Sequence, residues 1–452
     1  MINQKAEELY KDKRVLVFGL GVNQGGLGAA RFFAQAGAQV RVTDLKTEDE
    51  LKVSLDELKE FSNIEYTLGQ HREEDFDWAD LIIKNPGVKP GNKYLEYAKL
   101  QGKQIEMDMG ILLEFISPDR IVGVTGTKGK STTSSLIYQT LSRHCEENHD
   151  EAISQVLYAG NIGKSVLDVI PHLTDETLLV LEISSFQLEG FEPHRISPKY
   201  SVITNILPDH LNYYQNMKQY AEAKRIIARF QKPGDFLFIN ISDPITNSPR
   251  FLEALQAKVI YFSEFDLPDD FEPTLPGAHN KANYAASLKV AKVFEIREKD
   301  ALNYMNEFKG VEFRQQLIRE WNGVKIINDT AATGPNATIA SLKTYPNCIL
   351  IAGGVNKNLP YEDLSKLIDE SVKAVYFLEG DATETIKSQM ENQDKIKGTF
   401  NNFEELLNAL KPNLEKGDTV VLSPGAASFN LFQNEFDRGR KFNNAVEKIF
   451  TE

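Results

Sequence analysis

The stretch GVTGTKGKSTT, residues 123–133, follows an apolar run and precedes a helical pattern. It contains three glycines and two lysines, a composition that is poor for a packed core. Glycines let backbone N–H groups converge on an anion without a Cβ in the way, and a helix that begins at Lys130 adds the positive end of its dipole. The stretch therefore predicts a phosphate-binding loop between a strand and a helix.

The side chains of this loop suit a nucleoside triphosphate. We expect Lys130 to reach the β- and γ-phosphates and the hydroxyl of Ser131 or Thr132 to reach Mg²⁺. A strict phosphate loop would have glycine where Val124 stands, so a glycine-rich turn capped by Ser or Thr is the alternative. The GKST sequence at a strand-to-helix junction favours phosphate binding. The predicted ATP-binding residues here are Gly126, Thr127, Lys128, Gly129, Lys130, Ser131 and Thr132.

Length and composition limit the other function classes. A chain of 452 residues exceeds the usual size of one core and predicts two or three domains. The net charge of −14 argues against a broad nucleic-acid surface. Cys145 and Cys348 form no metal or disulfide framework, and no apolar run is long enough to span a membrane. With a polar N-terminus and no visible signal peptide, we expect a cytoplasmic protein.

Short β-branched runs alternate with helical patterns along the chain, which predicts an α/β fold. In most of these runs the odd-numbered and the even-numbered residues are both apolar, as expected for strands buried on both faces of a parallel sheet. They fall into three groups, with boundaries near residues 114–120 and 301–310. Loops that follow the strands carry most of the unusual residues, and ligands of such sheets bind at the carboxyl ends of strands.

The first group opens with VFGLGVNQGGLGAARFFAQAGAQVRVTD, residues 17–44, which reads as strand, glycine turn, helix, strand and acidic end. This order resembles a dinucleotide site, but after Gly19 and Gly21 the fingerprint breaks because position 24 is Gln. NAD and another pyrophosphate ligand both remain possible. Asp44 could bond a ribose or a base, or could be a solvated carboxylate at the end of a strand.

Two further candidates lie at or just past the ends of apolar strands in the second group. Glu182 stands in LLVLEIS, and His210 follows YSVITNI. A carboxylate and a neutral imidazole can complete a Mg²⁺ shell with the hydroxyl of Ser131. Lys224 belongs to a helical stretch, residues 219–230, and its pattern alone favours a solvated face.

The sequence PGAHNKAN, residues 276–283, begins another helix. His279, Asn280 and Asn283 project from its first turns, and amides at i and i+3 offer donors and acceptors on one face. The alternative is an Asn cap followed by a second surface Asn.

Eight motifs in order resemble the Mur ligases, and SSFQLE with DHL is most similar to the members that add D-glutamate. The motifs span nearly the whole chain. They are GTKGKSTT, AGNIG, EISSFQLE, PDHLNYY, YAEAK, PGAHNKAN, IINDTAAT and LSPGAAS.

This resemblance implies three α/β domains. They are a Rossmann-like UDP-substrate domain over residues 1–118, a central P-loop ATPase-type domain with a mostly parallel sheet over 119–311, and a Rossmann-like amino-acid domain over 312–452. The implied reaction uses ATP and Mg²⁺ to activate the carboxylate of UDP-N-acetylmuramoyl-L-alanine as an acyl phosphate, which D-glutamate attacks. Such a ligase makes a peptidoglycan precursor, and we expect a monomer without nucleic-acid or membrane partners.

The resemblance also implies roles for individual residues. The catalytic residues would be Lys130, Lys224 and His210, with a carbamylated Lys224 that becomes an anion able to sit between two Mg²⁺ ions. The metal ligands would be Ser131, Glu182, His210 and Lys224. ATP contacts beyond the loop would be Asn280, Asn283, Arg314 and Asp329. The UDP-linked substrate would contact Gly19, Gly21, Asp44, Asn85 and Asn161. D-Glutamate would contact Thr333, Lys357, Ser428 and Phe436.

The sequence departs from the family pattern at two places near the expected amino-acid pocket. Ala331 stands where members often have lysine, and Glu435 stands where an aromatic residue is expected, with Phe436 next. The competing functions are a related ligase such as a folylpolyglutamate-type enzyme, an NAD-linked oxidoreductase, and a non-catalytic nucleotide-binding module.

Overall fold

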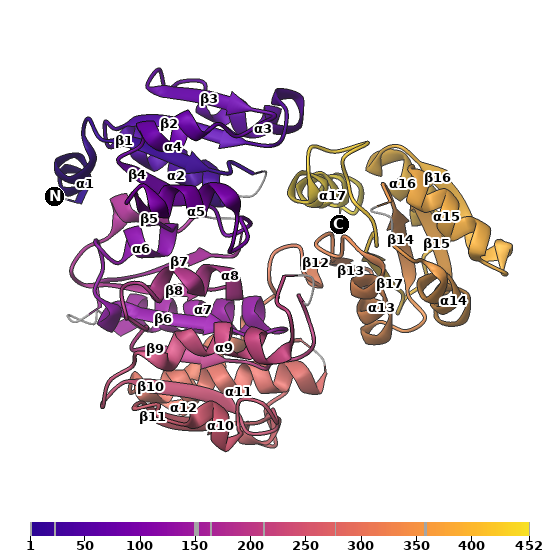
Figure 1. The fold of residues 1–452 in the computed structure, drawn as a ribbon. Coiled ribbons are helices and arrows are strands. Elements are labelled where there is room, and N and C mark those ends of the chain that lie inside the picture. The colour runs from indigo at the N-terminus through magenta and orange to yellow at the C-terminus, as the bar shows by residue number, and fades with distance from the viewer. Residues whose placement is uncertain are drawn as a thin grey trace. The chain divides into compact units, whose positions relative to one another are not determined.

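Figure 1 shows a computed structural model of the chain, which describes residues 2–21, 24–148, 153–162, 165–210, 213–275, 277–356 and 359–451. The chain forms two compact units. The first comprises Met1–Pro273 with Ala278–Asn306, and the second comprises Thr274–Gly277 with Glu307–Glu452. The first unit holds two sheets and the second holds one.

The N-terminal sheet of the first unit has the strand order β3-β2-β1-β4-β5, and all of its strands are parallel. Its central strands β1 and β4 are almost completely buried, as their continuous apolar runs predict. The strands are β1 Arg14–Phe18, β2 Gln39–Asp44, β3 Ile64–Leu68, β4 Leu81–Lys84 and β5 Gln104–Glu106. The helices are α1 Ile2–Tyr10, α2 Gln24–Gln35, α3 Glu48–Leu58, α4 Glu73–Trp78, α5 Lys93–Leu100 and α6 Asp108–Leu112.

The central sheet has the order β11-β10-β9-β6-β8-β7 and is also parallel. Strand β6 lies inside the sheet, so the loop that follows it is flanked by the ends of β8 and β9. The strands are β6 Ile121–Thr125, β7 Gln155–Gly160, β8 Thr177–Glu182, β9 Tyr200–Ile203, β10 Phe236–Asn240 and β11 Lys258–Phe262. The helices are α7 Lys130–Asn148, α8 Ser185–Leu188, α9 Met217–Arg229, α10 Pro249–Leu252, α11 Ala278–Val293 and α12 Glu298–Asn306.

The sheet of the second unit has the order β12-β13-β17-β14-β15-β16, in which only the β12–β13 pair is antiparallel. Two apolar clusters cover its two faces. The strands are β12 Gln316–Trp321, β13 Val324–Asn328, β14 Ile349–Gly353, β15 Ala374–Leu378, β16 Ile396–Phe400 and β17 Thr419–Leu422. The helices are α13 Pro335–Thr344, α14 Glu362–Ser371, α15 Asp381–Gln389, α16 Phe403–Leu410 and α17 Glu435–Ile449.

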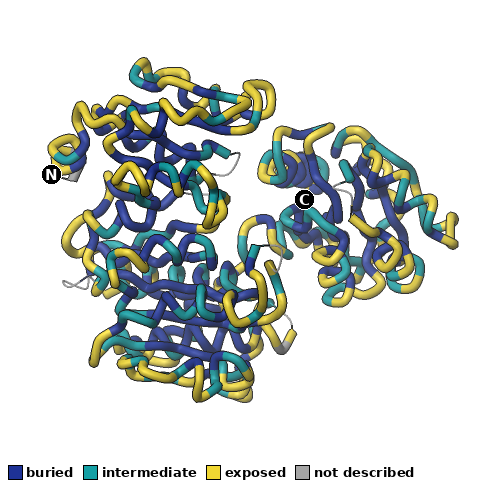
Figure 2. The backbone as a smooth tube through the Cα atoms, in the orientation of Figure 1, coloured by how far each residue is buried: buried dark blue, intermediate teal, exposed yellow. Residues whose placement is uncertain are grey.

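Figure 2 shows that the strands of the three sheets are mostly buried and that exposed residues gather on connecting loops and outer helix faces. The predicted α/β class is therefore confirmed. Among the described residues, no helix is both long and apolar enough to cross a membrane. Short 3₁₀ segments complete the structure: η1 Pro118–Arg120, η2 Leu167–His172, η3 Glu189–Phe191, η4 Glu264–Asp266, η5 Gln393–Lys395 and η6 Lys411–Asn413.

Candidate active site

The predicted phosphate loop runs from the end of β6 into the first turn of α7. Gly126 has φ +152° and Gly129 has φ +83°, conformations that L side chains rarely adopt. A Cβ at Gly126 would overlap Thr204 Oγ1, and one at Gly129 would lie 2.5 Å from Asn283 Oδ1. Both glycines are therefore required by backbone conformation and by close neighbours.

Two lysines converge on the carbonyl oxygen of Gly126. Lys130 Nζ donates to it at 3.0 Å and to Thr127 O at 3.1 Å, while Lys224 Nζ donates to it at 2.8 Å. Lys224 is 1% exposed, so the solvated-face interpretation of its helical pattern is wrong. Burial lowers the pKa of Lys224 well below its usual value, and the charge of Lys130 lowers it further. Its amine is consequently poised to lose a proton.

Glu182 ends β8 and is 1% exposed. Its Oε1 accepts a hydrogen bond from Asn161 Nδ2 at 2.9 Å, whereas its Oε2 is buried and has no hydrogen-bond partner among the described residues. A buried carboxylate oxygen without a donor is costly unless a cation binds it. This orphaned oxygen fits the predicted Mg²⁺ ligand.

A metal site here needs more than acidic and histidine side chains. Within the described part of the chain, no group of three His, Cys, Asp or Glu residues could hold a metal ion. The predicted set supplies two other kinds of ligand. Ser131, which is buried in the first turn of α7, would supply a hydroxyl oxygen, and a carbamate on Lys224 would supply an anionic oxygen. Unmodified, Lys224 presents an ammonium or amine to Gly126 and is not a typical Mg²⁺ ligand.

His210 follows β9 in a left-handed conformation, with φ +54°, and its side chain is 44% exposed. Its ring packs edge-on against Phe186 and Tyr220 at centroid distances of 5.0 and 6.0 Å. Burial lowers its pKa below the ordinary value, and the nearby lysines, Lys224 foremost, lower it further against the opposing effect of Asp209. The imidazole is therefore neutral at physiological pH and able to bind a metal.

The first turns of α11 pack against the phosphate loop and the start of α7. Asn280 and Asn283 are each 6% exposed, so a surface position for the second Asn is wrong. Asn283 Oδ1 accepts from Thr133 Oγ1 at 3.2 Å, and its Nδ2 donates to Asn280 Oδ1 at 3.3 Å. His279, by contrast, is exposed. Asn283 thus packs against the loop at Gly129, and Asn280 holds the Asn283 amide in place.

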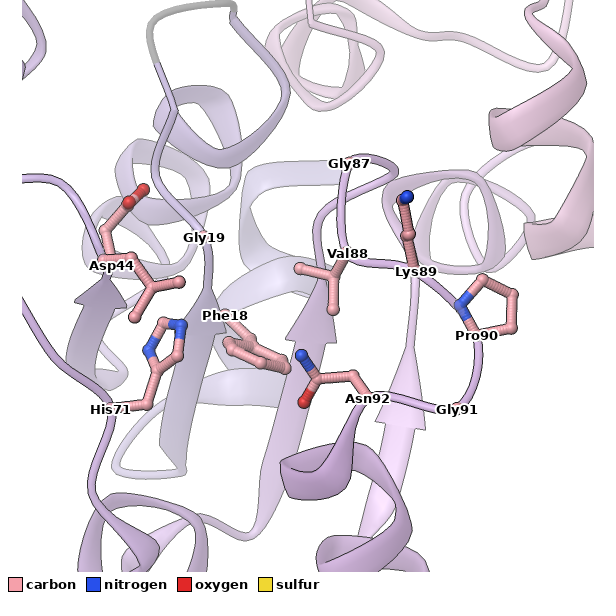
Figure 3. Close-up of a pocket in the computed structure, with 11 residues that line it drawn as sticks. Phe18, Gly19, Asp44, His71, Gly87, Val88, Lys89, Pro90, Gly91 and Asn92 are labelled. Atoms are coloured by element: carbon pink, nitrogen blue, oxygen red, sulfur yellow. The ribbon is translucent and has the colours of Figure 1, made fainter. Parts of the chain in front are cut away.

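The glycine turn of the N-terminal sheet is held by two predicted residues. Asp44 Oδ2 accepts from Gly21 N at 3.0 Å, and Asn85 Nδ2 donates to Gly19 O at 3.1 Å. Asp44 is only 9% exposed, so it is not a solvated carboxylate. These contacts fix the turn at the rim of a pocket of about 500 Å³, which Gly19 and Asp44 line (Figure 3).

The same pocket contains residues that the sequence patterns did not single out. His71 lies in the loop after β3, and its Nδ1 forms a 2.8 Å hydrogen bond with Thr43 Oγ1. Its ring lies edge-on to that of Phe18, with 4.7 Å between the ring centroids. Lys89 and Asn92 come from the loop after β4 (Figure 3). The loop after β4 has the sequence NPGVKPG, residues 85–91, and is one of the strand-end loops with unusual residues, whereas His71 belongs to no motif.

In the second unit, two loops meet at the ends of β13 and β17. Asp329 Oδ2 accepts from Ser423 Oγ at 2.8 Å, and its Oδ1 accepts from Gln315 N at 3.1 Å. Burial raises the pKa of Asp329 to about 6, although hydrogen bonds and the charge of Arg314 lower it. The predicted residues Arg314 and Asp329 therefore lie in one neighbourhood of this unit.

The residues predicted to bind D-glutamate differ from one another in burial and in hydrogen bonding. Thr333 N donates to Ala331 O at 2.9 Å in the turn after Asp329. Ser428 is 2% exposed, and its Oγ has no hydrogen-bond partner among the described residues. Phe436 is 36% exposed, with its ring 6.1 Å from that of Phe313. Lys357 lies outside the described residues.

Three family models match the chain in order. They are the Mur ligase MurD-like N-terminal domain over residues 13–106, the Mur ligase middle domain over 124–291 and the Mur ligase glutamate ligase domain over 313–425. A relative from Roseiflexus sp. (strain RS-1), named UDP-N-acetylmuramoylalanine–D-glutamate ligase, is 39% identical, and the match covers 97% of this chain and 99% of that protein. The chain belongs to the Mur ligase family.

Other Mur ligases agree with this placement. A Borreliella afzelii (strain PKo) protein of the same name is 37% identical, covering 97% of this chain and 98% of its own. The structure of UDP-N-acetylmuramoylalanyl-D-glutamyl-2,6-diaminopimelate–D-alanyl-D-alanyl ligase from Acinetobacter baumannii has a TM-score of 0.58 at 15% identity, covering 99% of this chain and 97% of that chain. The family resemblance and the three-domain Mur ligase architecture are confirmed.

Within this Mur ligase, the first unit brings the predicted phosphate, metal and lysine residues to the carboxyl ends of neighbouring strands. Sequence reasoning missed Tyr220, whose Oη lies 3.2 Å from Thr127 Oγ1, and Thr204, whose Oγ1 donates to Lys128 O at 2.6 Å. Both stabilise the loop that carries the lysines. The YAEAK motif contained Tyr220, but its pattern indicated only a helix.

Proposed function

We propose that this Mur ligase adds D-glutamate to UDP-N-acetylmuramoyl-L-alanine, with ATP hydrolysed to ADP and phosphate, in the synthesis of a peptidoglycan precursor. The observation that carries the proposal is the orphaned Oε2 of Glu182 beside a phosphate loop in the central sheet. The MurD-like N-terminal match and the names of the full-length relatives support this choice of substrates.

The chemistry follows from the poor reactivity of a free carboxylate. Transfer of the γ-phosphoryl group to that carboxylate gives an acyl phosphate and ADP. The amine of D-glutamate then attacks the acyl carbon, so that the C–N bond forms, the C–O bond to phosphate breaks and the amine loses a proton. Lys130 would neutralise phosphate charge, and the loop amides would orient the transferred group.

Mg²⁺ would be held by Ser131, Glu182 and His210, and it would reduce the repulsion between the phosphates and the substrate carboxylate. For Lys224 we propose a carbamate. The neutral amine that burial favours can add to CO₂ and lose a proton, which replaces a cation with an anion. That carbamate would face the metal together with Glu182.

The other assignments belong to the same proposal. ATP would also contact Asn280, Asn283, Arg314 and Asp329. The UDP-linked substrate would occupy the pocket of Figure 3, which Gly19 and Asp44 line. It would also contact Gly21 and Asn85, which hydrogen-bond to Asp44 and Gly19, and Asn161 nearer the reacting carboxylate. D-Glutamate would bind Thr333, Lys357, Ser428 and Phe436. We propose domains over 1–118, 119–311 and 312–452, a monomer as the working form, and the cytoplasm as the compartment.

A substrate-panel assay tests the proposal. Purified protein with ATP, Mg²⁺ and UDP-N-acetylmuramoyl-L-alanine should release phosphate and form the amide product only when D-glutamate is added. L-Glutamate and other amino acids serve as matched controls, and mass spectrometry identifies the product. Phosphate release without D-glutamate, or no amide with it, would overturn the proposed reaction.

A further inference from the structure

A partly buried ion pair joins strand β4 of the N-terminal sheet to the 3₁₀ segment η3, which follows strand β8 and helix α8 of the central domain, within the first unit. Lys84 is the last residue of β4, and its Nζ donates to Glu189 Oε2 at 2.9 Å. The side chains of Lys84 and Glu189 are 9% and 22% exposed. When one partner of such a pair is removed, the other is left as an uncompensated and largely desolvated charge, so the pair constrains both elements.

Glu189 makes a second contact through its other oxygen. Tyr213 Oη donates to Glu189 Oε1 at 3.1 Å, and burial with the charge of Glu189 raises the pKa of this phenol, which keeps it a donor at neutral pH. Tyr213 N donates to His210 O at 2.9 Å. The ring of Phe186 packs against Tyr213 at 4.6 Å and against His210 at 5.0 Å. The carboxylate is thus linked to the turn that carries His210.

The opposite end of this chain of contacts reaches the N-terminal pocket. Lys84 directly precedes Asn85, whose N donates to Phe18 O at 3.1 Å and whose side chain donates to Gly19 O. Phe18 and Gly19 both line the pocket of Figure 3. A ligand that moves this glycine turn would therefore move the strand end that holds Lys84.

We propose that Lys84, Glu189 and Tyr213 form a positioning chain that couples the N-terminal pocket to the orientation of His210. Only the expected effect of this chain on turnover rests on the proposed function; the contacts themselves do not. None of the three residues is assigned to substrate or metal, so their role is to set where the imidazole lies.

Nuclear magnetic resonance of protein with ¹⁵N-labelled histidine tests the chain without turnover. Lys84→Met should shift the imidazole resonance that His210→Ala assigns, whereas Lys99→Met, which removes the exposed Lys99–Glu96 pair, should leave it in place. Tyr213→Phe deletes a single hydroxyl and must give a shift of the same resonance even if Lys84→Met fails to fold. An unchanged His210 resonance in folded Tyr213→Phe protein would overturn the inference.

Kinetics provide the second measurement. Lys84→Met should lower kcat about tenfold while KM for the UDP-linked substrate changes less than about threefold, and adding Tyr213→Phe should cost little more, because coupled residues are not additive. If the loss of kcat in the double variant equals the product of the two single-variant losses, the residues act independently and the chain is contradicted. If wild-type protein forms no amide, the proposed function fails, yet the resonance experiment still decides the inference.

Discussion

The side chain of Lys224 donates a 2.8 Å hydrogen bond to the carbonyl oxygen of Gly126, the first glycine of the phosphate loop. Lys130 donates to the same oxygen at 3.0 Å. Two side chains that are usually cationic therefore share one backbone acceptor, with Lys224 only 1% exposed. Repulsion and burial both favour the neutral amine at Lys224, which is the form that reacts with CO₂.

Lys224→Ala should lower kcat at least about a hundredfold if a carbamate serves the reaction, and acetate or formate should restore part of the activity. Protein incubated with ¹³C-bicarbonate should give a carbamate signal that the variant lacks. Lys218→Ala, an exposed position on the same helix, is the control and should behave as wild type. A variant without rescue and a wild-type spectrum without the signal would exclude the carbamate.

Glu182→Gln should weaken Mg²⁺ binding and at the same time raise the free energy of unfolding. The amide keeps an oxygen for Asn161 but removes the charge from the orphaned position, so we expect the Mg²⁺ concentration for half-maximal activity to rise at least about tenfold. Without Mg²⁺, urea unfolding should show the variant to be about 1 kcal/mol more stable, because a neutral amide replaces a buried carboxylate whose Oε2 has no hydrogen-bond partner among the described residues. A wild-type Mg²⁺ dependence would show that Glu182 is not a ligand.

The parts of the site that could be predicted from sequence are local ones. The glycines and hydroxyls of residues 126–132 form the predicted loop between β6 and α7 through their own local sequence, and Glu182 and His210 stand at or just past the ends of apolar strands. Parallel strands place such ends at one edge of a sheet, so their convergence followed from the strand pattern.

The parts that sequence could not predict depend on packing between distant segments. Lys224 lies on a helix whose pattern alone indicated a solvated face, but the side that α9 buries is set by the sheet beneath it. His71 enters the N-terminal pocket because β3 lies beside β2, and no motif marks it. The ion pair of Lys84 with Glu189 joins residues 105 positions apart. Periodicity within one segment carries no information on these contacts.

Gly126→Ala should damage the protein more than an alanine at another left-handed glycine. Gly234 has φ +100°, and a Cβ there would meet no atom beyond its chain neighbours within 4 Å, so Gly234→Ala should cost only the backbone strain of about 1 kcal/mol. At Gly126 the Cβ also meets Thr204, so the loss in free energy of unfolding should be at least about 2 kcal/mol larger. Equilibrium dialysis should show weaker ATP binding for Gly126→Ala alone, and equal affinities would contradict the loop's assigned role.

Asp329 should make stability depend on pH in the acidic range. Burial raises its folded-state pKa from 3.8 to about 6, so the folded protein holds this proton more tightly than the unfolded chain does. The resulting stabilisation is fully present below pH 3.8 and is lost as the pH rises through about 6, a change of up to about 3 kcal/mol. Asp108, whose pKa burial also raises to about 6, contributes in the same window and same direction.

Replacing Asp329 isolates its share of that dependence. Asp329→Asn cannot titrate, so its unfolding midpoint should fall less than that of wild type between pH 4 and 6.5, while Asp108 contributes equally to both proteins. The exposed Asp363→Asn is the matched control and should follow the wild-type profile. Thermal unfolding of the full chain gives the midpoints, which are read from the transition of the second unit because that unit contains Asp329. Parallel profiles for wild type and Asp329→Asn would mean that Asp329 is ionised in the folded protein throughout this range, because its two hydrogen bonds and Arg314 would then outweigh its burial.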